Sequence, residues 1–130
     1  MSEENVNAAR KAYEDFNSGN IPGVVGIIAD EVEWIEHGGG KAPSGTFTSP
    51  DAVQNEVFAP IPENFDEFVC TPENFEDEGD KVTVTGRFTG KSKSGAELDA
   101  TFTHNWEFKD GKVTRLENGV DKEAWAAAWS

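Results

Sequence analysis

The chain has 130 residues, of which 36% are hydrophobic and 11% aromatic, which suits one domain over residues 1–130 with one packed core. Its formal net charge of −14 repels phosphate backbones and anionic lipid, so we expect neither nucleic acid nor a membrane as a partner. No apolar run approaches the length of a membrane span, and the N-terminus lacks the basic and apolar blocks of a signal peptide. A cytoplasmic location is therefore expected.

The first part of the chain predicts two helices. Residues 3–18 carry apolar side chains at helical spacing: Val6, Ala9, Ala12, Tyr13 and Phe16. Gly19 ends this helix, and Asn20 caps a second, shorter one over residues 21–29, with Pro22 in its first turn.

A strand, a loop and a third helix are expected next. Residues 31–37, "EVEWIEH", place Val32, Trp34 and Glu36 on one side of a strand. We expect a loop over residues 38–48. Ser49, followed by a proline and an aspartate, is a typical helix start, and this helix should end before Pro60 and Pro62.

The remainder reads mostly as strand, at residues 65–76, 81–90, 97–108 and 112–120. Pro72 favours an edge strand or a bulge, and Asp110-Gly111 predicts a tight hairpin. A last helix follows Asp121 and brings Trp125 near Trp129, one turn away. Helices first and antiparallel strands later indicate an α+β fold, with the helices packed on one face of a curved sheet.

Residues 97–108, "ELDATFTHNWEF", alternate so that His104 falls on the apolar side, between Phe102 and Trp106. A buried neutral imidazole must donate from one ring nitrogen and accept at the other. His104 therefore has either a structural partner or a ligand that supplies one. The large aromatic neighbours are typical of a pocket wall.

Glu36 offers a second polar group, next to Trp34 on one face of its strand. A carboxylate in an apolar cavity has a raised pKa, and an imidazole titrates near neutrality, so Glu36 and His104 together suit proton abstraction beside a carbonyl. The structural alternatives are that Glu36 points to water and that Trp34 and Trp106 are core residues.

Other titratable groups have simpler interpretations. Arg87 either faces inward, toward a substrate carboxylate or Glu36, or faces outward and balances the acidic surface. Tyr13 is expected in the core, with its hydroxyl at a pocket rim, His37 is expected to be exposed, and Cys70 is a small core residue without a disulfide partner. Neither a phosphate-binding glycine motif nor a metal-ligand pattern is present, so no cofactor and no metal are expected.

Three stretches resemble the SnoaL-like proteins: "AYEDFNSGN", "IIADEVEW" and "FTHNWEFKDGKV". These proteins belong to the superfamily that also holds nuclear transport factor 2, the ketosteroid isomerases and scytalone dehydratase. The resemblance implies a cone-shaped fold, with a bent antiparallel sheet around a long helix and an internal pocket at the open end. It also implies a homodimer joined through the outer face of the sheet.

The resemblance implies site residues as well. Glu36 falls where the ketosteroid isomerases carry their aspartate base, and His104 falls where they carry a protonated aspartate that stabilises the enolate. Tyr13 lies one residue from their tyrosine donor. In SnoaL-type cyclases a histidine acts with an aspartate on the adjacent strand, a position that reads Asn118 here. Because an amide cannot take a proton, Asp121 or Glu36 would have to replace it.

The expected function is a cofactor-independent isomerase, cyclase or dehydratase acting on a small apolar carbonyl compound, with Glu36 as base and His104 as hydrogen-bond donor. The expected substrate-binding residues are Tyr13, Trp34, Phe102, Trp106, Asn118 and Asp121. Two alternatives stay open: a binding module that holds a small apolar ligand without chemistry, and a structural dimer whose own side chains fill the pocket.

Overall fold

The structure, a computed structural model, describes residues 2–38 and 41–129. Its helices are α1 (Ser2–Asn17), α2 (Ile21–Val25), α3 (Pro50–Val53), the π-helix η1 (Gln54–Phe58), α4 (Pro60–Asn64) and α5 (Lys122–Trp129). Its strands are β1 (Ile28–His37), β2 (Ser44–Phe47), β3 (Phe65–Glu78), β4 (Lys81–Ser92), β5 (Glu97–Lys109) and β6 (Lys112–Val120). The α+β fold is confirmed.

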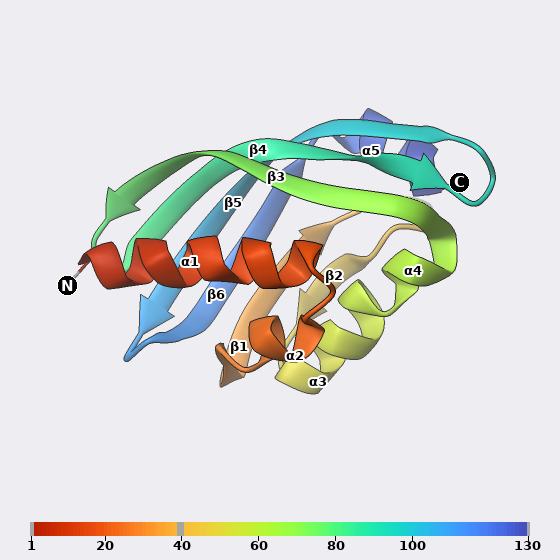
Figure 1. Cartoon of the computed structure of the whole chain (residues 1–130). Helices are drawn as coiled ribbons and strands as arrows, with labels where there is room; N and C mark the ends of the chain where they lie inside the picture. Colours follow the sequence, from red (N-terminus) through yellow and green to blue (C-terminus); the bar gives the residue numbers. More distant parts are fainter. Residues whose placement is uncertain (1, 39–40, 130) are drawn as a thin grey trace.

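One curved sheet holds all six strands in the order β2-β1-β6-β5-β4-β3, and α1 lies along its concave face (Figure 1). Ala9, Ala12 and Tyr13 bury the apolar stripe of α1 against that face. Side chains near both ends of α1 bond the edge strand β3. The amide of Asn17 donates to the Cys70 carbonyl (2.7 Å) and accepts from the Cys70 N–H (3.0 Å), and the Asn5 amide donates to the Gly79 carbonyl near the other end.

All neighbouring strands are antiparallel except β1 and β6, which are parallel. The expected antiparallel sheet is therefore interrupted at one place, between its second and third strands. The reason lies in chain order: no hairpin joins β1 to β6, so no short turn forces them to run in opposite directions.

The alternation expected for residues 97–108 is confirmed along β5. The side chains of Leu98, Ala100, Phe102, His104, Trp106 and Phe108 are all buried. At the end of β5, Asp110 (φ 52°) and Gly111 (φ 79°) form the expected tight turn. Pro72 lies on the edge strand β3 beside an irregularity in its pairing with β4, as expected.

Two of the expected boundaries are wrong. The second helix ends at Val25 instead of residue 29, because residues 27 and 28 turn to pair with β6 at Val113. Residues 44–47, expected as part of a loop over 38–48, form β2 and pair with Trp34–His37 of β1. This short segment has no alternating apolar pattern, so the partner strand decides its conformation. Gly39 and Gly40 of that expected loop lie outside the described residues.

The third helix begins as expected, with the Ser49 hydroxyl accepting from the Ala52 N–H (3.1 Å). It does not simply stop before the two prolines. It widens into η1, where the Ala59 N–H bonds the Gln54 carbonyl, and then continues as α4, which Pro60 and Pro62 begin. Proline is compatible with the first turn of a helix, because the N–H groups of that turn have no intrahelical partner.

The last helix, α5, packs against β5 and β4 and lies behind β4 in the view of Figure 1. Asp121 caps it, with a carboxylate oxygen accepting from the Ala124 N–H (3.3 Å). The rings of Trp125 and Trp129 are 5.7 Å apart, as their spacing predicts. None of the described helices has the length and apolar character that crossing a bilayer requires.

Candidate functional site

A cavity of about 70 Å³ lies between the concave face of the sheet and the helices. At about 10–15 Å³ per enclosed water, it has room for roughly five waters, or for a ligand about the size of a single ring. Aromatic rings make up much of its lining: Tyr13, Phe16, Trp34, Phe58, Phe68, Phe88, Trp106, Trp125 and Trp129. Flat apolar walls of this kind suit a flat or cyclic ligand.

Glu36 brings a carboxyl group into this cavity from β1, because it lies on the buried side of the strand with Val32 and Trp34. One carboxyl oxygen accepts from the Trp34 indole N–H (2.8 Å) and the other from the Asn118 amide (2.9 Å). Burial raises the pKa of Glu36 from 4.5 to about 7, although these two hydrogen bonds and nearby His37 act in the opposite direction. Near neutral pH the group can therefore take up or release a proton.

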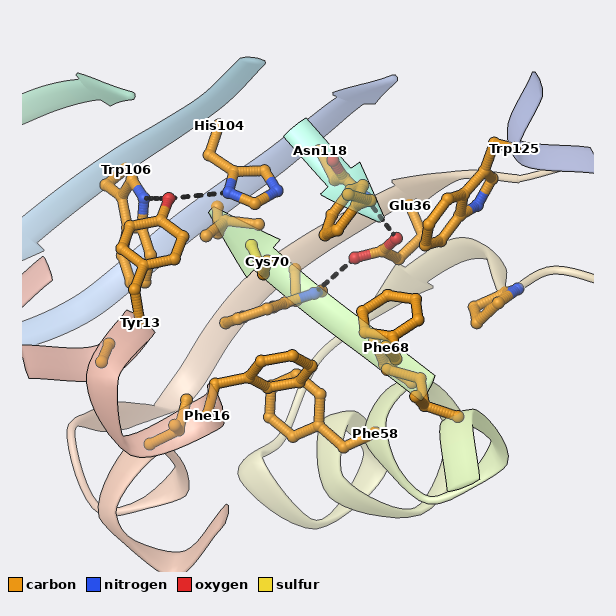
Figure 2. A pocket seen from close by; sticks show the side chains of 18 of the residues that line it. Tyr13, Phe16, Glu36, Phe58, Phe68, Cys70, His104, Trp106, Asn118 and Trp125 are labelled. Atoms are coloured by element: carbon orange, nitrogen blue, oxygen red, sulfur yellow. Dashed lines mark hydrogen bonds between the residues drawn. The ribbon is translucent and has the colours of Figure 1, made fainter. Parts of the chain in front are cut away.

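His104 is held by a relay of hydrogen bonds that starts at Trp106. The Trp106 indole N–H donates to the Tyr13 hydroxyl oxygen (3.0 Å), and that hydroxyl lies 2.7 Å from His104 Nδ1 (Figure 2). Since the indole can only donate, the simplest assignment has the Tyr13 O–H donating onward to Nδ1. The neutral ring then carries its proton on Nε2, the nitrogen turned toward Asn118 in Figure 2.

Burial lowers the pKa of His104 from 6.5 to about 3, and the Asn118 amide opposes this only in part. The ring is therefore neutral near pH 7 and serves as a hydrogen-bond donor through Nε2–H. Asn118 pairs with His104 across β5 and β6. The Asn118 amide oxygen nevertheless has no hydrogen bond of normal geometry to any described residue. Even so, Asn118 lies close enough to His104 to act on its pKa as a hydrogen-bonding group, so it is the neighbour that the Nε2–H faces.

Most residues expected at the site are brought together. Those that line the cavity are Tyr13, Trp34, Glu36, His104, Trp106 and Asn118. Phe102 does not line it, because its ring stacks behind His104 at a centroid distance of 4.0 Å. Asp121 is exposed at the start of α5 and does not reach the cavity.

Arg87 and His37 also lie away from the cavity. Arg87 points outward and pairs with Asp99, so of its two interpretations the surface one holds. His37 is partly exposed and bonds Glu117 (2.8 Å) on the neighbouring strand.

Several lining residues were not anticipated as part of the site. Phe88 lies on the buried side of β4, a position that strand alternation indicates. Trp125 and Trp129 reach the cavity from α5, where their spacing predicted only a contact with each other. Cys70 also lines the cavity wall. Burial and, to a smaller extent, the charge of Glu36 raise the pKa of the Cys70 thiol, so the thiol stays protonated.

Four lining side chains also border a larger surface groove of about 460 Å³ next to α4: Phe16, Phe58, Ile61 and Phe68. Only side chains therefore separate the cavity from the surface on this side. Phe58 ends the π-helix η1, a type of irregularity that is frequent beside functional sites. Among the described residues no group of three His, Cys, Asp or Glu side chains is placed to hold a metal ion.

The family model of the SnoaL-like domain matches residues 9–116. None of the curated proteins matches the chain. Among solved structures, an NTF2-like protein of unknown function from Burkholderia pseudomallei is similar, with 23% identity, a TM-score of 0.88 and coverage of 98% of both chains.

Two further structures carry names that refer to chemistry. TerC, crystallised with polyporic acid, has 26% identity over 96% of this chain and 97% of its own, with a TM-score of 0.84. A Jannaschia protein that bears the name SnoaL-like polyketide cyclase has 20% identity over 98% of this chain and 92% of its own, with a TM-score of 0.80. At these identities the similarity establishes the shared fold.

Proposed function

The chain belongs to the SnoaL-like domain family, and on that premise we propose that it is a small-molecule pocket protein that catalyses proton transfer on a small apolar carbonyl compound. The observation that carries this proposal is the buried Glu36 carboxyl group, with a pKa of about 7, in the same cavity as a neutral His104. A general base works best when its pKa lies near the working pH.

Glu36 is the proposed base. Its carboxylate takes a proton from the carbon next to the ligand carbonyl, and the electrons of the broken C–H bond move onto the carbonyl oxygen to form an enolate. The protonated Glu36 can return the proton to the same carbon or to a conjugated one, so the step needs no cofactor. The indole of Trp34 and the amide of Asn118 keep the carboxyl group in one orientation.

His104 is the proposed donor to the enolate oxygen. Its low pKa keeps the ring neutral, and its bond with Tyr13 places the ring proton on Nε2, where a ligand oxygen would take the place of the neighbouring Asn118 amide as acceptor. A donor held in place before the reaction needs no reorganisation when charge develops on the oxygen. Trp34 and Trp106, whose rings meet edge to face at 6.4 Å, supply adjoining apolar walls for the ligand.

The proposal extends to the reaction class and the assembly. The proposed reaction is that of an isomerase, a cyclase or a dehydratase, since each begins with this proton abstraction. One similar structure is named a polyketide cyclase, and such an enzyme would use the same carbonyl chemistry. A homodimer and a cytoplasmic location complete the proposal. The alternative is a module that binds the same ligand class without chemistry, which the mostly apolar lining of the cavity also supports.

Exchange of hydrogen for deuterium on a simple ketone tests this function, because the exchange requires only a base and a donor to the carbonyl oxygen. Cyclohexanone is incubated in D₂O with the protein, and proton NMR follows the loss of the signal from its α-protons. The wild type is expected to accelerate exchange above the buffer rate. Glu36→Gln should lower the protein-dependent rate by about 100-fold or more, the scale of a general base, and His104→Ala should also lower it.

Glu31→Gln is the matched control, because Glu31 is an exposed residue of the same strand, and it should keep the wild-type rate. Exchange that persists at the wild-type rate in Glu36→Gln contradicts the role of Glu36. Saturable binding of cyclohexanone by the wild type with no exchange supports the binding module instead.

A further inference from the structure

Three buried polar side chains lie in one row across the sheet. Glu36 of β1 is the register partner of Asn118 of β6, and Asn118 is in turn the partner of His104 of β5. All three side chains are buried and line the cavity on the concave face. Asn118 therefore stands between the proposed base and the proposed donor, and its amide does not titrate.

The direction of the Asn118 amide follows from what its two neighbours can do. An ionised carboxylate can only accept, so the amide turns its NH₂ group to Glu36, at 2.9 Å. The amide oxygen is then left for the Nε2–H of His104, since it has no other partner in the described part of the chain. While Glu36 is ionised, the amide thus favours the ring proton of His104 on Nε2.

A protonated Glu36 does not fit the same arrangement. Its two oxygens already accept from the Trp34 indole and the Asn118 amide, and the added O–H needs an acceptor of its own. Trp34 cannot supply one, because an indole only donates. The Asn118 amide can, if it turns over and presents its oxygen to Glu36. The two ends of an amide have nearly the same size, so this turn needs no repacking of the cavity wall.

Turning the amide over has a consequence at His104. The NH₂ group then points at Nε2, which must accept, so the ring proton moves to Nδ1. The neutral ring loses one proton to solvent at Nε2 and takes up one at Nδ1, and its charge stays zero. The Tyr13 hydroxyl, 2.7 Å from Nδ1, can accept there as well as donate. Its oxygen has two lone pairs, so the Trp106 indole keeps its acceptor.

The other titratable groups that face this row do not change charge between pH 5 and 9. Among the described residues that line the cavity, α1 contributes Tyr13 and β3 contributes Cys70, and burial raises the pKa of both. The side chains that reach the cavity from β4, η1, α4 and α5 carry no titratable group. His37 of β1 lies outside the cavity and acts on Glu36 through its charge.

We propose that Asn118 is a positioning residue that couples the base to the donor. While Glu36 is ionised, the amide holds the His104 proton on Nε2, and when Glu36 gains a proton, the amide turns over and the His104 proton moves to Nδ1. The consequence rests on the proposed function: the free protein has its base ionised and its enolate donor on Nε2 in the same state. During turnover the ligand oxygen accepts from Nε2–H in place of the amide, so the coupling acts on the ligand-free protein.

The tautomer of His104 in the ligand-free protein tests this coupling. ¹⁵N NMR shows which ring nitrogen carries the proton, and ¹³C NMR of the labelled Glu36 carboxyl group follows its titration between pH 5 and 9. In the wild type the ratio of the Nε2–H to the Nδ1–H tautomer should rise about tenfold as Glu36 ionises, the scale of one hydrogen bond. Glu36→Gln should make this ratio independent of pH.

Asn118→Leu removes the amide at similar side-chain size. The tautomer ratio of this variant should also stay constant with pH, although Glu36 still titrates. Asn105→Leu is the matched control, because it makes the same change at an exposed position of β5, and it should keep the wild-type dependence. A merely structural Asn118 would lower the stability of Asn118→Leu and leave the pH dependence of the ratio in place.

The wild type alone can overturn the coupling, so the test does not depend on a variant folding. A tautomer ratio that stays constant while Glu36 titrates near pH 7 overturns the coupling and leaves the proposed function standing. A ratio that still follows Glu36 in Asn118→Leu overturns the role of Asn118. A Glu36 carboxyl group that titrates near pH 4.5 overturns both the coupling and the proposed base.

Discussion

Replacing Glu36 with glutamine should change how stability depends on pH. An unfolded glutamate releases its proton near pH 4.5, whereas the folded protein holds that proton up to about pH 7. Between these values the native state binds more protons than the unfolded state, so the carboxyl group lowers the free energy of unfolding as the pH rises. At about 1.4 kcal/mol per pKa unit, the loss between pH 4.5 and 7 is about 3 kcal/mol.

His104 acts in the opposite direction. Its folded pKa of about 3 lies below the unfolded value of 6.5, so its contribution to stability is lost as the pH falls from 6.5 toward 3. Both proteins contain His104, so subtracting the wild-type value from that of Glu36→Gln cancels this term. The remaining difference should rise by about 3 kcal/mol between pH 4 and 8.

Urea unfolding followed by tryptophan fluorescence at several pH values measures this difference. Glu31→Gln makes the same chemical change at an exposed position of β1 and should give a difference that stays flat with pH. Glutamine has only one acceptor for the two donors that now bond Glu36, which adds a cost that is constant with pH. A flat difference for Glu36→Gln would refute the claim that burial raises the pKa of this carboxyl group.

Three further outcomes are expected. Tyr13→Phe removes the hydroxyl between Trp106 and His104, so it should lower the free energy of unfolding by about 1–3 kcal/mol. It should also shift the His104 ring away from the Nε2–H tautomer, which ¹⁵N NMR detects, and an unchanged tautomer would contradict the relay. Gly86→Ala places a Cβ 2.2 Å from the Thr71 carbonyl oxygen, so it should destabilise the protein by about 1–3 kcal/mol in the same urea assay. An unaltered midpoint of urea unfolding would contradict the close packing at Gly86. Cys70 should react with a thiol reagent such as DTNB only at the rate of unfolding, because it is 3% exposed and its thiol pKa is raised; fast labelling of the folded protein would show that the wall opens.

Periodicity was the most informative feature of the sequence. Alternation along residues 97–108 placed His104 on the apolar side of its strand, and the same logic placed Glu36 on one side of β1 with Trp34. Alternation alone left open whether the side with Glu36 faces water, and the structure shows that it is buried. These strands carry strong patterns because one face of each is buried. β2 carries none, and it forms only because β1 offers an unpaired edge.

Contacts between distant residues were beyond prediction from local pattern. The bond between Tyr13 and His104 joins residues 91 apart, and it decides which ring nitrogen carries the proton. The sequence likewise gives no sign that α5 turns Trp125 and Trp129 toward the same cavity, since a spacing of four residues indicates only that they share a helix face. Phe102 and Asp121 show the converse: a suitable residue type on the right element does not by itself reach the cavity.

The pH dependence of cyclohexanone deuterium exchange tests the role of Glu36 most directly. If the buried carboxylate is the base, the protein-dependent rate should rise with pH and level off with a midpoint near 7, and Glu36→Gln should abolish that component. A midpoint near 4.5, or a wild-type profile unchanged by Glu36→Gln, would contradict the assignment of Glu36 as the base.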